Sequence, residues 1–144
     1  MNFFWKRLLK HRDRDLRPQR LDYMNEALAL ERQGDFDAAL TSYRLALRDD
    51  PSDPRILQNI AIAFSKADQQ EEAIRSYQKA LEIDHELMGA HYGLAFLLLR
   101  RGESTSAAVH LKAFLANPPK DAEAQQWIDH ARHTLVGLGH PGGT

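Results

Sequence analysis

The apolar positions of this chain recur at helical spacing, and the stretch from Glu71 to Asp84 shows the pattern most clearly. Its apolar residues fall at i, i+4, i+7 and i+8: Ala73, Tyr77, Ala80 and Leu81. This spacing predicts a helix with one buried face. Because the alanines are small, a neighbouring helix can approach closely, and we expect such a partner helix against this face.

The same pattern returns at a fixed interval of 34 residues. This interval separates Ala39, Ala73 and Ala107, and it also separates Tyr43 from Tyr77. A period of this length indicates stacked structural repeats, in which each unit buries its apolar face against its neighbours. We assign three repeats, over residues 20–53, 54–87 and 88–121.

Each repeat is predicted to consist of two helices joined by a turn. The turns fall at Gly34, Asp68 and Gly102, which share the 34-residue interval. A left-handed backbone conformation is common at such a helix end, and glycine adopts it best and aspartate acceptably. Between the first two repeats, Asp53 is predicted to cap a helix that begins at Pro54.

Three segments lie outside the repeats. Residues 1–19 form a basic arm: residues 1–20 hold seven Lys or Arg against two Asp, whereas the rest of the chain holds 12 basic against 18 acidic residues. The arm can be drawn as an amphipathic helix. Its apolar side carries Phe4, Trp5, Leu8 and Leu9. Residues 122–136 are predicted to form a helix that caps the last repeat, and the glycine-rich residues 137–144 a flexible tail.

The composition narrows the classes of protein. The chain has 144 residues, 43% of them hydrophobic and 27% charged, with a formal net charge of −1 and no cysteine. Disulfides, thiol catalysis and thiolate metal sites are therefore excluded. No apolar run is long enough to span a bilayer, and Lys6 and Arg7 interrupt the N-terminal apolar groups, so we expect no signal peptide. We expect a cytoplasmic protein, with peripheral attachment at the inner face of a membrane as the alternative.

Candidate chemistry is sparse. The chain has no glycine-rich phosphate loop and no nucleophile aligned with a base, so we predict no enzymatic activity and no cofactor. His130 and His133 share one helix face, but two ligands do not make a metal site, and we interpret them as an exposed polar face. His91 is interpreted as a hydrogen-bonded packing residue. We expect no nucleic-acid binding, because Asp13 and Asp15 interrupt the basic arm.

The repeats resemble the tetratricopeptide repeat family over about residues 20–121. The residues that carry the resemblance are Ala27, Gly34, Phe36, Ala39, Tyr43, Ala46, Pro51, Leu57, Ile60, Ala61, Phe64, Ala73, Tyr77, Ala80, Leu94, Ala95, Gly102, Ala107 and Pro119. The resemblance implies an all-α fold, a right-handed superhelical α-solenoid of three helix-turn-helix units with a C-terminal capping helix. It also implies that the first helices line a concave groove that binds peptides or partner helices.

Positions between the core residues of the first helices are predicted to face this groove. They are Leu21, Met24, Leu28, Arg32, Arg55, Gln58, Asn59, Ile62, Lys66, Tyr92, Phe96, Leu99 and Arg100. Because many of them are apolar, we expect a protein-interaction adaptor that binds an apolar peptide or an amphipathic helix of a partner protein. Some family members clamp a terminal carboxylate in this groove. Here only Asn59 matches that pattern, so we predict no such clamp.

The basic arm leaves three interpretations open. It can dock on the groove of its own chain or of a sister chain, giving autoinhibition or a homo-oligomer. It can lie on an anionic membrane surface with its cations outward. It can also simply cap the first repeat. The first two interpretations support an alternative function, a self-assembling or membrane-associated scaffold.

Overall fold

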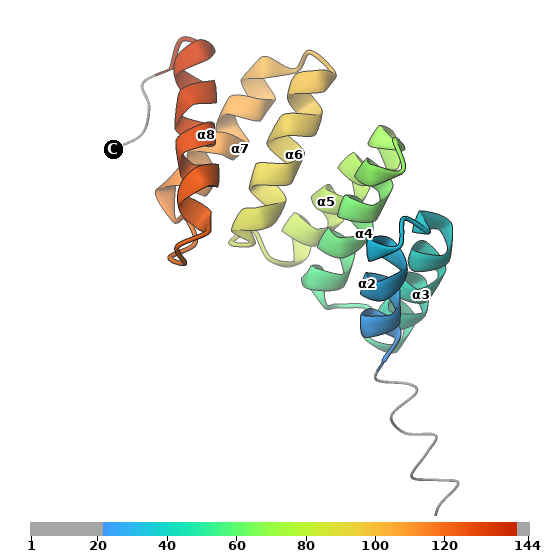
Figure 1. The fold of residues 1–144 in the computed structure, drawn as a ribbon. Helices are drawn as coiled ribbons and strands as arrows, with labels where there is room; N and C mark the ends of the chain where they lie inside the picture. Colours follow the sequence, from blue (N-terminus) through green and yellow to red (C-terminus); the bar gives the residue numbers. More distant parts are fainter. Residues whose placement is uncertain (1–21, 141–144) are drawn as a thin grey trace, which may run out of the picture. The chain divides into compact units, whose positions relative to one another are not determined.

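The computed structural model describes residues 22–140, and the regular secondary structure in this range is entirely helical, as predicted (Figure 1). The helices are α2 (Tyr23–Arg32), α3 (Phe36–Asp49), α4 (Pro54–Lys66), α5 (Gln70–Ile83), α6 (Met88–Arg100), α7 (Ser104–Ala116) and α8 (Ala124–Gly137). The chain divides into two compact units, residues 1–51 and residues 52–144.

The first unit contains the hairpin of α2 and α3. Ala27, Ala39 and Tyr43 are fully buried between the two helices. The Tyr43 hydroxyl donates a hydrogen bond of 2.7 Å to the carboxylate of Glu31. Burial, followed by this bond to Glu31, raises the pKa of Tyr43, so the hydroxyl stays protonated and available as a donor. Asp35 caps α3 by accepting a hydrogen bond from the backbone N–H of Ala38.

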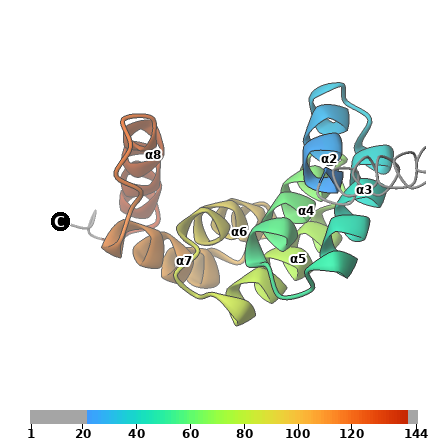
Figure 2. The same cartoon turned by 90° about the horizontal axis from the view of Figure 1, so that it is seen from below.

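The second unit contains two hairpins, α4–α5 and α6–α7, with α5 packed against α6 and α8 packed against α7 (Figures 1 and 2). The predicted buried face of α5 is confirmed for Ala73, Tyr77 and Ala80, which are at most 5% exposed, whereas Leu81 is half-buried. Asp53 caps α4 through the backbone N–H of Arg55, with Pro54 as the first helical residue, as expected. The cap at Asp53 and the proline after it fix where α4 begins. The small buried residues Ala73 and Ala80 allow the helices to pack closely.

The turn residues at the 34-residue interval adopt the predicted left-handed conformation. Gly34, Asp68 and Gly102 have φ angles of 80°, 60° and 84°. In each case the residue after the turn residue donates its backbone N–H to the carbonyl oxygen of the residue five positions before it. These pairs are Asp35 to Leu30, Gln69 to Phe64 and Glu103 to Leu98. This is the hydrogen bonding of a Schellman motif, which satisfies carbonyl groups left over at a helix end.

Helix α8 ends in the same way, at positions assigned from the sequence to the flexible tail. Gly137 is its last helical residue, Gly139 has a φ angle of 81°, and the His140 N–H bonds to the Leu135 carbonyl at 3.0 Å. Residues 137–140 therefore close the helix, and what is left of the predicted tail, residues 141–144, lies outside the described residues. The predicted arm, residues 1–19, lies outside them as well.

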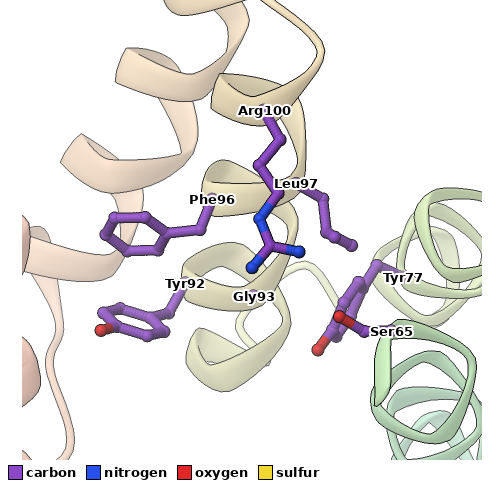
Figure 3. Close-up of a pocket in the computed structure, with 7 residues that line it drawn as sticks. All are labelled: Ser65, Tyr77, Tyr92, Gly93, Phe96, Leu97 and Arg100. Carbon is purple, nitrogen blue, oxygen red and sulfur yellow. The ribbon is translucent and has the colours of Figure 1, made fainter. Parts of the chain in front are cut away.

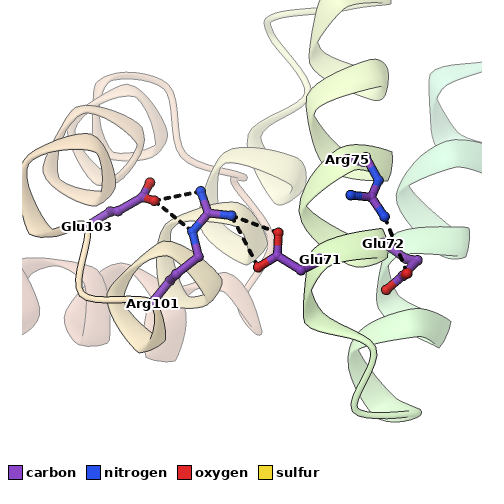
Figure 4. Close-up of polar contacts among 5 residues, drawn as sticks. All are labelled: Glu71, Glu72, Arg75, Arg101 and Glu103. Carbon is purple, nitrogen blue, oxygen red and sulfur yellow. Dashed lines mark hydrogen bonds and ion pairs between the residues drawn. The ribbon is translucent and has the colours of Figure 1, made fainter.

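Arg101 links three elements of the second unit (Figure 4). It follows α6, and its guanidinium donates to both carboxylate oxygens of Glu71 on α5, at 3.0 and 3.3 Å. It also donates to Glu103, immediately before α7, at 2.7 Å. All three side chains are at least 36% exposed, so the network contributes little to the stability of the fold.

Candidate functional site

A cavity of about 340 Å³ opens in the second unit and receives side chains from every helix of that unit. Its lining residues are Gln58 and Ile62 on α4, Tyr77 on α5, Gly89, Tyr92 and Gly93 on α6, Phe114 on α7, Pro119 in the following loop, and Trp127 on α8. The lining is mainly aliphatic and aromatic. Concave, largely apolar cavities of roughly 300–1,000 Å³ are the usual form of ligand-binding sites.

A second cavity of about 210 Å³ adjoins the first and shares Tyr77, Tyr92 and Gly93 with it (Figure 3). Its other lining residues are Ser65, Phe96, Leu97 and Arg100. Because α6 contributes to both cavities, we call the two together the α6 groove. The groove runs along α6 from Gly89 to Arg100, with α4 and α5 on one side and Trp127 of α8 reaching the Gly89 end.

Two glycines on α6 allow side chains of neighbouring helices to reach the floor of the groove. The hydroxyl of Tyr77 occupies the space that a Cβ of residue 93 would take. At Gly89 the corresponding space is approached by the side-chain amide of Gln58, whose nitrogen would lie 2.8 Å from a Cβ there. The two positions are one helical turn apart and face the same way. A side chain at either position would therefore change the groove itself.

One wall of the groove consists of aromatic side chains from α6, α7 and α8. Tyr92 lies near Phe96, Phe114 and Trp127, with ring-centroid separations of 4.8, 5.2 and 6.3 Å. The Tyr92 hydroxyl lies 2.8 Å from Nδ1 of His130, whose ring stacks on Phe96 at a centroid separation of 4.5 Å. Burial raises the pKa of Tyr92, so its hydroxyl remains a donor.

Gln58 and Arg100 are polar residues of the lining, beside Ser65 and the two tyrosines Tyr77 and Tyr92. The side-chain oxygen of Gln58 is buried and has no hydrogen-bond partner among the described residues. The Arg100 guanidinium is exposed, and within residues 22–140 it forms no ion pair or side-chain hydrogen bond. By contrast, Arg55 at the start of α4 is held by Asp53 through two hydrogen bonds of 3.1 Å. The Asp53 pKa is lowered chiefly by this side-chain hydrogen bond.

The structure brings five of the predicted groove residues together around the two cavities: Gln58, Ile62, Tyr92, Phe96 and Arg100. The remaining predicted residues of the second unit line neither cavity: Arg55, Asn59, Lys66 and Leu99. Asn59 and Leu99 are half-buried, while Lys66 is exposed. Phe96 and Tyr92 are also half-buried, because α8 covers part of each ring.

The predicted residues of the first unit lie on α2. Met24 and Leu28 are half-buried, and Arg32 is exposed, with its Nε donating to the Leu28 carbonyl oxygen at 3.2 Å. Leu21 precedes the described residues, as do the arm residues Phe4, Trp5, Leu8 and Leu9.

Sequence reasoning missed Trp127, Phe114, Pro119 and the two glycines. Trp127 was overlooked because its helix was treated only as a cap. A signal was present: the buried residues Ala90 and Leu94 are followed 34 residues later by Ala124 and Ile128, which are also buried. Helix α8 thus begins in the register of a first helix, and Trp127 lies one residue beyond the position equivalent to Tyr92.

The histidines form contacts of two kinds. His91 is 8% exposed, and its Nε2 lies 2.7 Å from the His85 carbonyl oxygen, as expected for a hydrogen-bonded packing residue. Its Nδ1 lies 2.9 Å from Nδ1 of His110, whose pKa is lowered by burial and then by the neighbouring imidazole. His130 is exposed but also contacts Tyr92 and Phe96, which its assignment to a purely polar face did not anticipate. Within residues 22–140, no three metal-binding side chains are grouped to hold an ion.

Comparison with known families agrees with the repeat pattern. A family model described as "Tetratricopeptide repeat" matches residues 23–63, and one described as "TPR repeat" matches residues 63–102. Solved structures of tetratricopeptide repeat proteins match the fold of the chain. The chain is therefore a tetratricopeptide repeat protein.

Two curated relatives illustrate the range of the match. Photosystem I assembly protein Ycf3 of Acaryochloris marina is 27% identical over 133 residues, which cover 80% of each protein. The peroxisomal targeting signal receptor of Candida glabrata is 28% identical over 102 residues, but the chain spans only 17% of that receptor. No helix among residues 22–140 has the length and apolar character needed to cross a membrane.

Two solved structures show the similarity of fold. The type III secretion chaperone SycD of Yersinia enterocolitica, in complex with a peptide of the translocator YopD, superposes with a TM-score of 0.76 at 18% identity, covering 82% of this chain and 90% of that one. The first TPR of Spaghetti (RPAP3), bound to an HSP90 peptide, superposes with a TM-score of 0.72 at 19% identity, covering 84% and 97%. At these identities the comparison establishes the fold.

Proposed function

We propose that this protein is an interaction adaptor that binds an apolar segment of a partner protein in the α6 groove. The observation that carries the proposal is the cavity of about 340 Å³ lined by Ile62, Tyr92, Phe114, Pro119 and Trp127. Trp127 is 41% exposed although it is the largest apolar side chain of α8. An apolar ligand side chain placed against it removes further apolar surface from water, which is the main driving force of such binding.

The relatives support this role at a general level. Both structures cited above contain a bound peptide: one of HSP90 on a TPR domain of Spaghetti (RPAP3), and one of YopD on the chaperone SycD. In this chain the groove offers aromatic and aliphatic side chains and few charges, so the ligand we propose is apolar. Catalysis is not part of the proposal. The scaffold role of residues 1–19 stays a prediction, because these residues lie outside the described part of the chain.

The proposal is tested by selecting peptides from a random display library on the full chain and measuring their affinity for two variants. Ile62→Asp places a charge in the cavity, whereas Val109→Asp places one on α7 at a 61% exposed position that lines neither cavity. We expect the selected peptides to be apolar and to bind Ile62→Asp at least about tenfold more weakly, since burying one large side chain contributes roughly 1.5–3 kcal/mol. Val109→Asp should retain binding.

Circular dichroism of both variants verifies that each remains folded. Peptides that bind wild type and a folded Ile62→Asp variant equally well would show that the groove is not the binding site. Trp127 supplies an independent readout: in a Trp5→Phe background it is the remaining tryptophan, and binding in the cavity should shift its fluorescence to shorter wavelength. An unshifted spectrum at saturation would contradict the proposal.

A further inference from the structure

We propose that the paired imidazoles of His91 and His110 form a proton-operated latch between α6 and α7, which is closed at neutral pH and opens on acidification. The closed latch holds together the part of the groove wall formed by Tyr92 and Phe114. This inference goes beyond the proposed function, because it concerns the protein without a ligand and depends on two residues that line neither cavity.

The positions of the hydrogens in the pair follow from the acceptor at one end of it. Nε2 of His91 lies 2.7 Å from the carbonyl oxygen of His85, which can only accept a hydrogen bond, so Nε2 carries a hydrogen. In a neutral imidazole the other ring nitrogen is then an acceptor. Nδ1 of His91 lies 2.9 Å from Nδ1 of His110, so the hydrogen between these two nitrogens belongs to His110.

This arrangement accommodates one additional proton but not two. If His110 alone is protonated, its Nδ1 still donates to Nδ1 of His91. If both imidazoles are protonated, two N–H groups and two positive charges meet at 2.9 Å with no acceptor between them. The closed pair therefore excludes the second proton, whereas separated imidazoles in water bind both. Because the open form binds more protons, a lower pH shifts the equilibrium towards it.

The surroundings of the pair do not offset the added charge. His91 is 8% exposed, and burial, followed by the charge of His91, lowers the pKa of His110. The opening should therefore set in below the usual imidazole value near 6.5. Within residues 22–140, neither imidazole forms an ion pair with the charged or titratable side chains of the surrounding elements. These include Arg55 on α4, Glu82 on α5, Asp84, His85 and Glu86 in the turn before α6, Lys112 on α7 and His130 on α8.

The pair adjoins the aromatic wall of the groove. His91 directly precedes Tyr92 on α6, and His110 lies about one helical turn before Phe114 on α7. The rings of Tyr92 and Phe114 have a centroid separation of 5.2 Å, and both line the larger cavity. Separation of the two imidazoles therefore moves apart the two helical turns that carry these rings.

The test uses nuclear magnetic resonance of the full chain without a ligand, between pH 7.5 and pH 5.0. Nitrogen–proton correlation spectra of the imidazoles at pH 7.5 should show a hydrogen on Nε2 of His91 and on Nδ1 of His110. At pH 5.0 the nuclear Overhauser contacts between the rings of Tyr92 and Phe114 should be lost.

Amide hydrogen exchange, corrected for the intrinsic effect of pH, measures how local the opening is. Between pH 7.5 and pH 5.0 the protection of residues 90–94 on α6 should fall about tenfold, the equilibrium effect of one lost hydrogen bond. The protection of residues 57–61 on α4 should change by less than about twofold, because these residues open separately from the pair.

A substitution of His110 separates the latch from other effects of pH. In His110→Asn the side-chain amide takes the place of Nδ1. It donates to a neutral His91 and, when turned over, accepts from a protonated one, so the contact survives acidification. We expect this variant to keep the ring contacts and the amide protection at pH 5.0. His110→Gln carries the same amide on a longer side chain and serves as the second variant if His110→Asn does not fold.

His130→Gln is the matched control, because it removes the other imidazole that contacts the wall. The Tyr92 hydroxyl can donate to a neutral His130 and accept from a protonated one, so this contact does not require opening at low pH. His130→Gln should therefore respond to pH as the wild type does.

Three results would overturn the latch. The first is a hydrogen on Nδ1 of His91 at pH 7.5. The second is a contact between the Tyr92 and Phe114 rings that persists in the wild type at pH 5.0, or that is lost equally in the folded His110 variant. The third is an equal loss of protection in α4 and α6, which indicates global unfolding. Because no ligand is present, these results leave the proposed peptide binding untouched, and the two proposals can fail separately.

Discussion

The hydroxyl oxygen of Tyr92 on α6 lies 2.8 Å from Nδ1 of His130 on α8, and the His130 ring stacks on Phe96 with an interplanar angle of 8°. These contacts join the helix that lines the groove to the helix that carries Trp127. The position of Trp127 in the groove therefore depends on a polar contact as well as on Ile128, Ala131 and Leu135, which form the buried face of α8.

We predict a measurable coupling between Tyr92 and His130. In a double-mutant cycle of Tyr92→Phe and His130→Ala, urea unfolding should give a coupling free energy of about 0.5–1.5 kcal/mol, the usual contribution of one hydrogen bond. His133→Ala, an exposed position on the same helix, should change stability by no more than about 0.5 kcal/mol. If the effects of Tyr92→Phe and His130→Ala add within error, the hydrogen bond does not stabilise the α6–α8 contact.

Substitution of Gly93 should be costly, whereas substitution of Gly89 should not. At position 93 the methyl group of alanine meets the ring and hydroxyl of Tyr77, which is only 5% exposed and has little room to move. We expect Gly93→Ala to lower the free energy of unfolding by about 1–3 kcal/mol. At position 89 only the Gln58 amide obstructs the methyl group, and this flexible side chain can turn aside. Gly89→Ala should be nearly neutral in thermal unfolding, and a loss as large as that of Gly93→Ala would contradict the steric explanation.

Asp68 is the non-glycine residue with a positive φ angle among the described residues, at 60°, so its replacement by glycine should stabilise the protein. Relief of the left-handed strain outweighs the added freedom of the unfolded chain, and we expect a gain of about 0.5–1 kcal/mol. Gly102→Ala is the reciprocal change and should cost at least about 1 kcal/mol. Apart from Gly102 and its chain neighbours, no atom lies within 4 Å of the position that a Cβ would take there, so this loss would come from the backbone. Chemical denaturation measures both variants, and equal stability of Asp68→Gly and wild type would contradict the prediction.

His110 should make the stability of the protein depend on pH. Burial, followed by the neighbouring His91, lowers the pKa of His110 below its usual value near 6.5. The unfolded chain therefore binds more protons than the folded one just below that value, and the free energy of unfolding falls as the pH falls through it. Urea unfolding between pH 5 and pH 7.5 should show a flatter dependence for His110→Gln than for wild type. Parallel curves would exclude a contribution from His110.

The sequence by itself determined the helices, their pairing and their turns, because these depend on short-range preferences repeated three times. The left-handed conformation of Gly34, Asp68 and Gly102 follows from steric rules that act within a few residues, and the 34-residue interval repeats the same local pattern in each unit. The five groove residues that were found, such as Ile62 and Arg100, followed from their place on the first helices.

The tertiary structure alone decided the composition of the groove. Trp127 and Tyr92 are 35 residues apart, and no local rule states that α8 brings the tryptophan to the cavity or covers part of the Tyr92 ring. Likewise, Gly93 gains its importance from Tyr77 on another helix, and the Gln58 oxygen is buried without a hydrogen-bond partner among residues 22–140. Such properties arise from contacts between residues distant in sequence, which spacing along one helix does not encode.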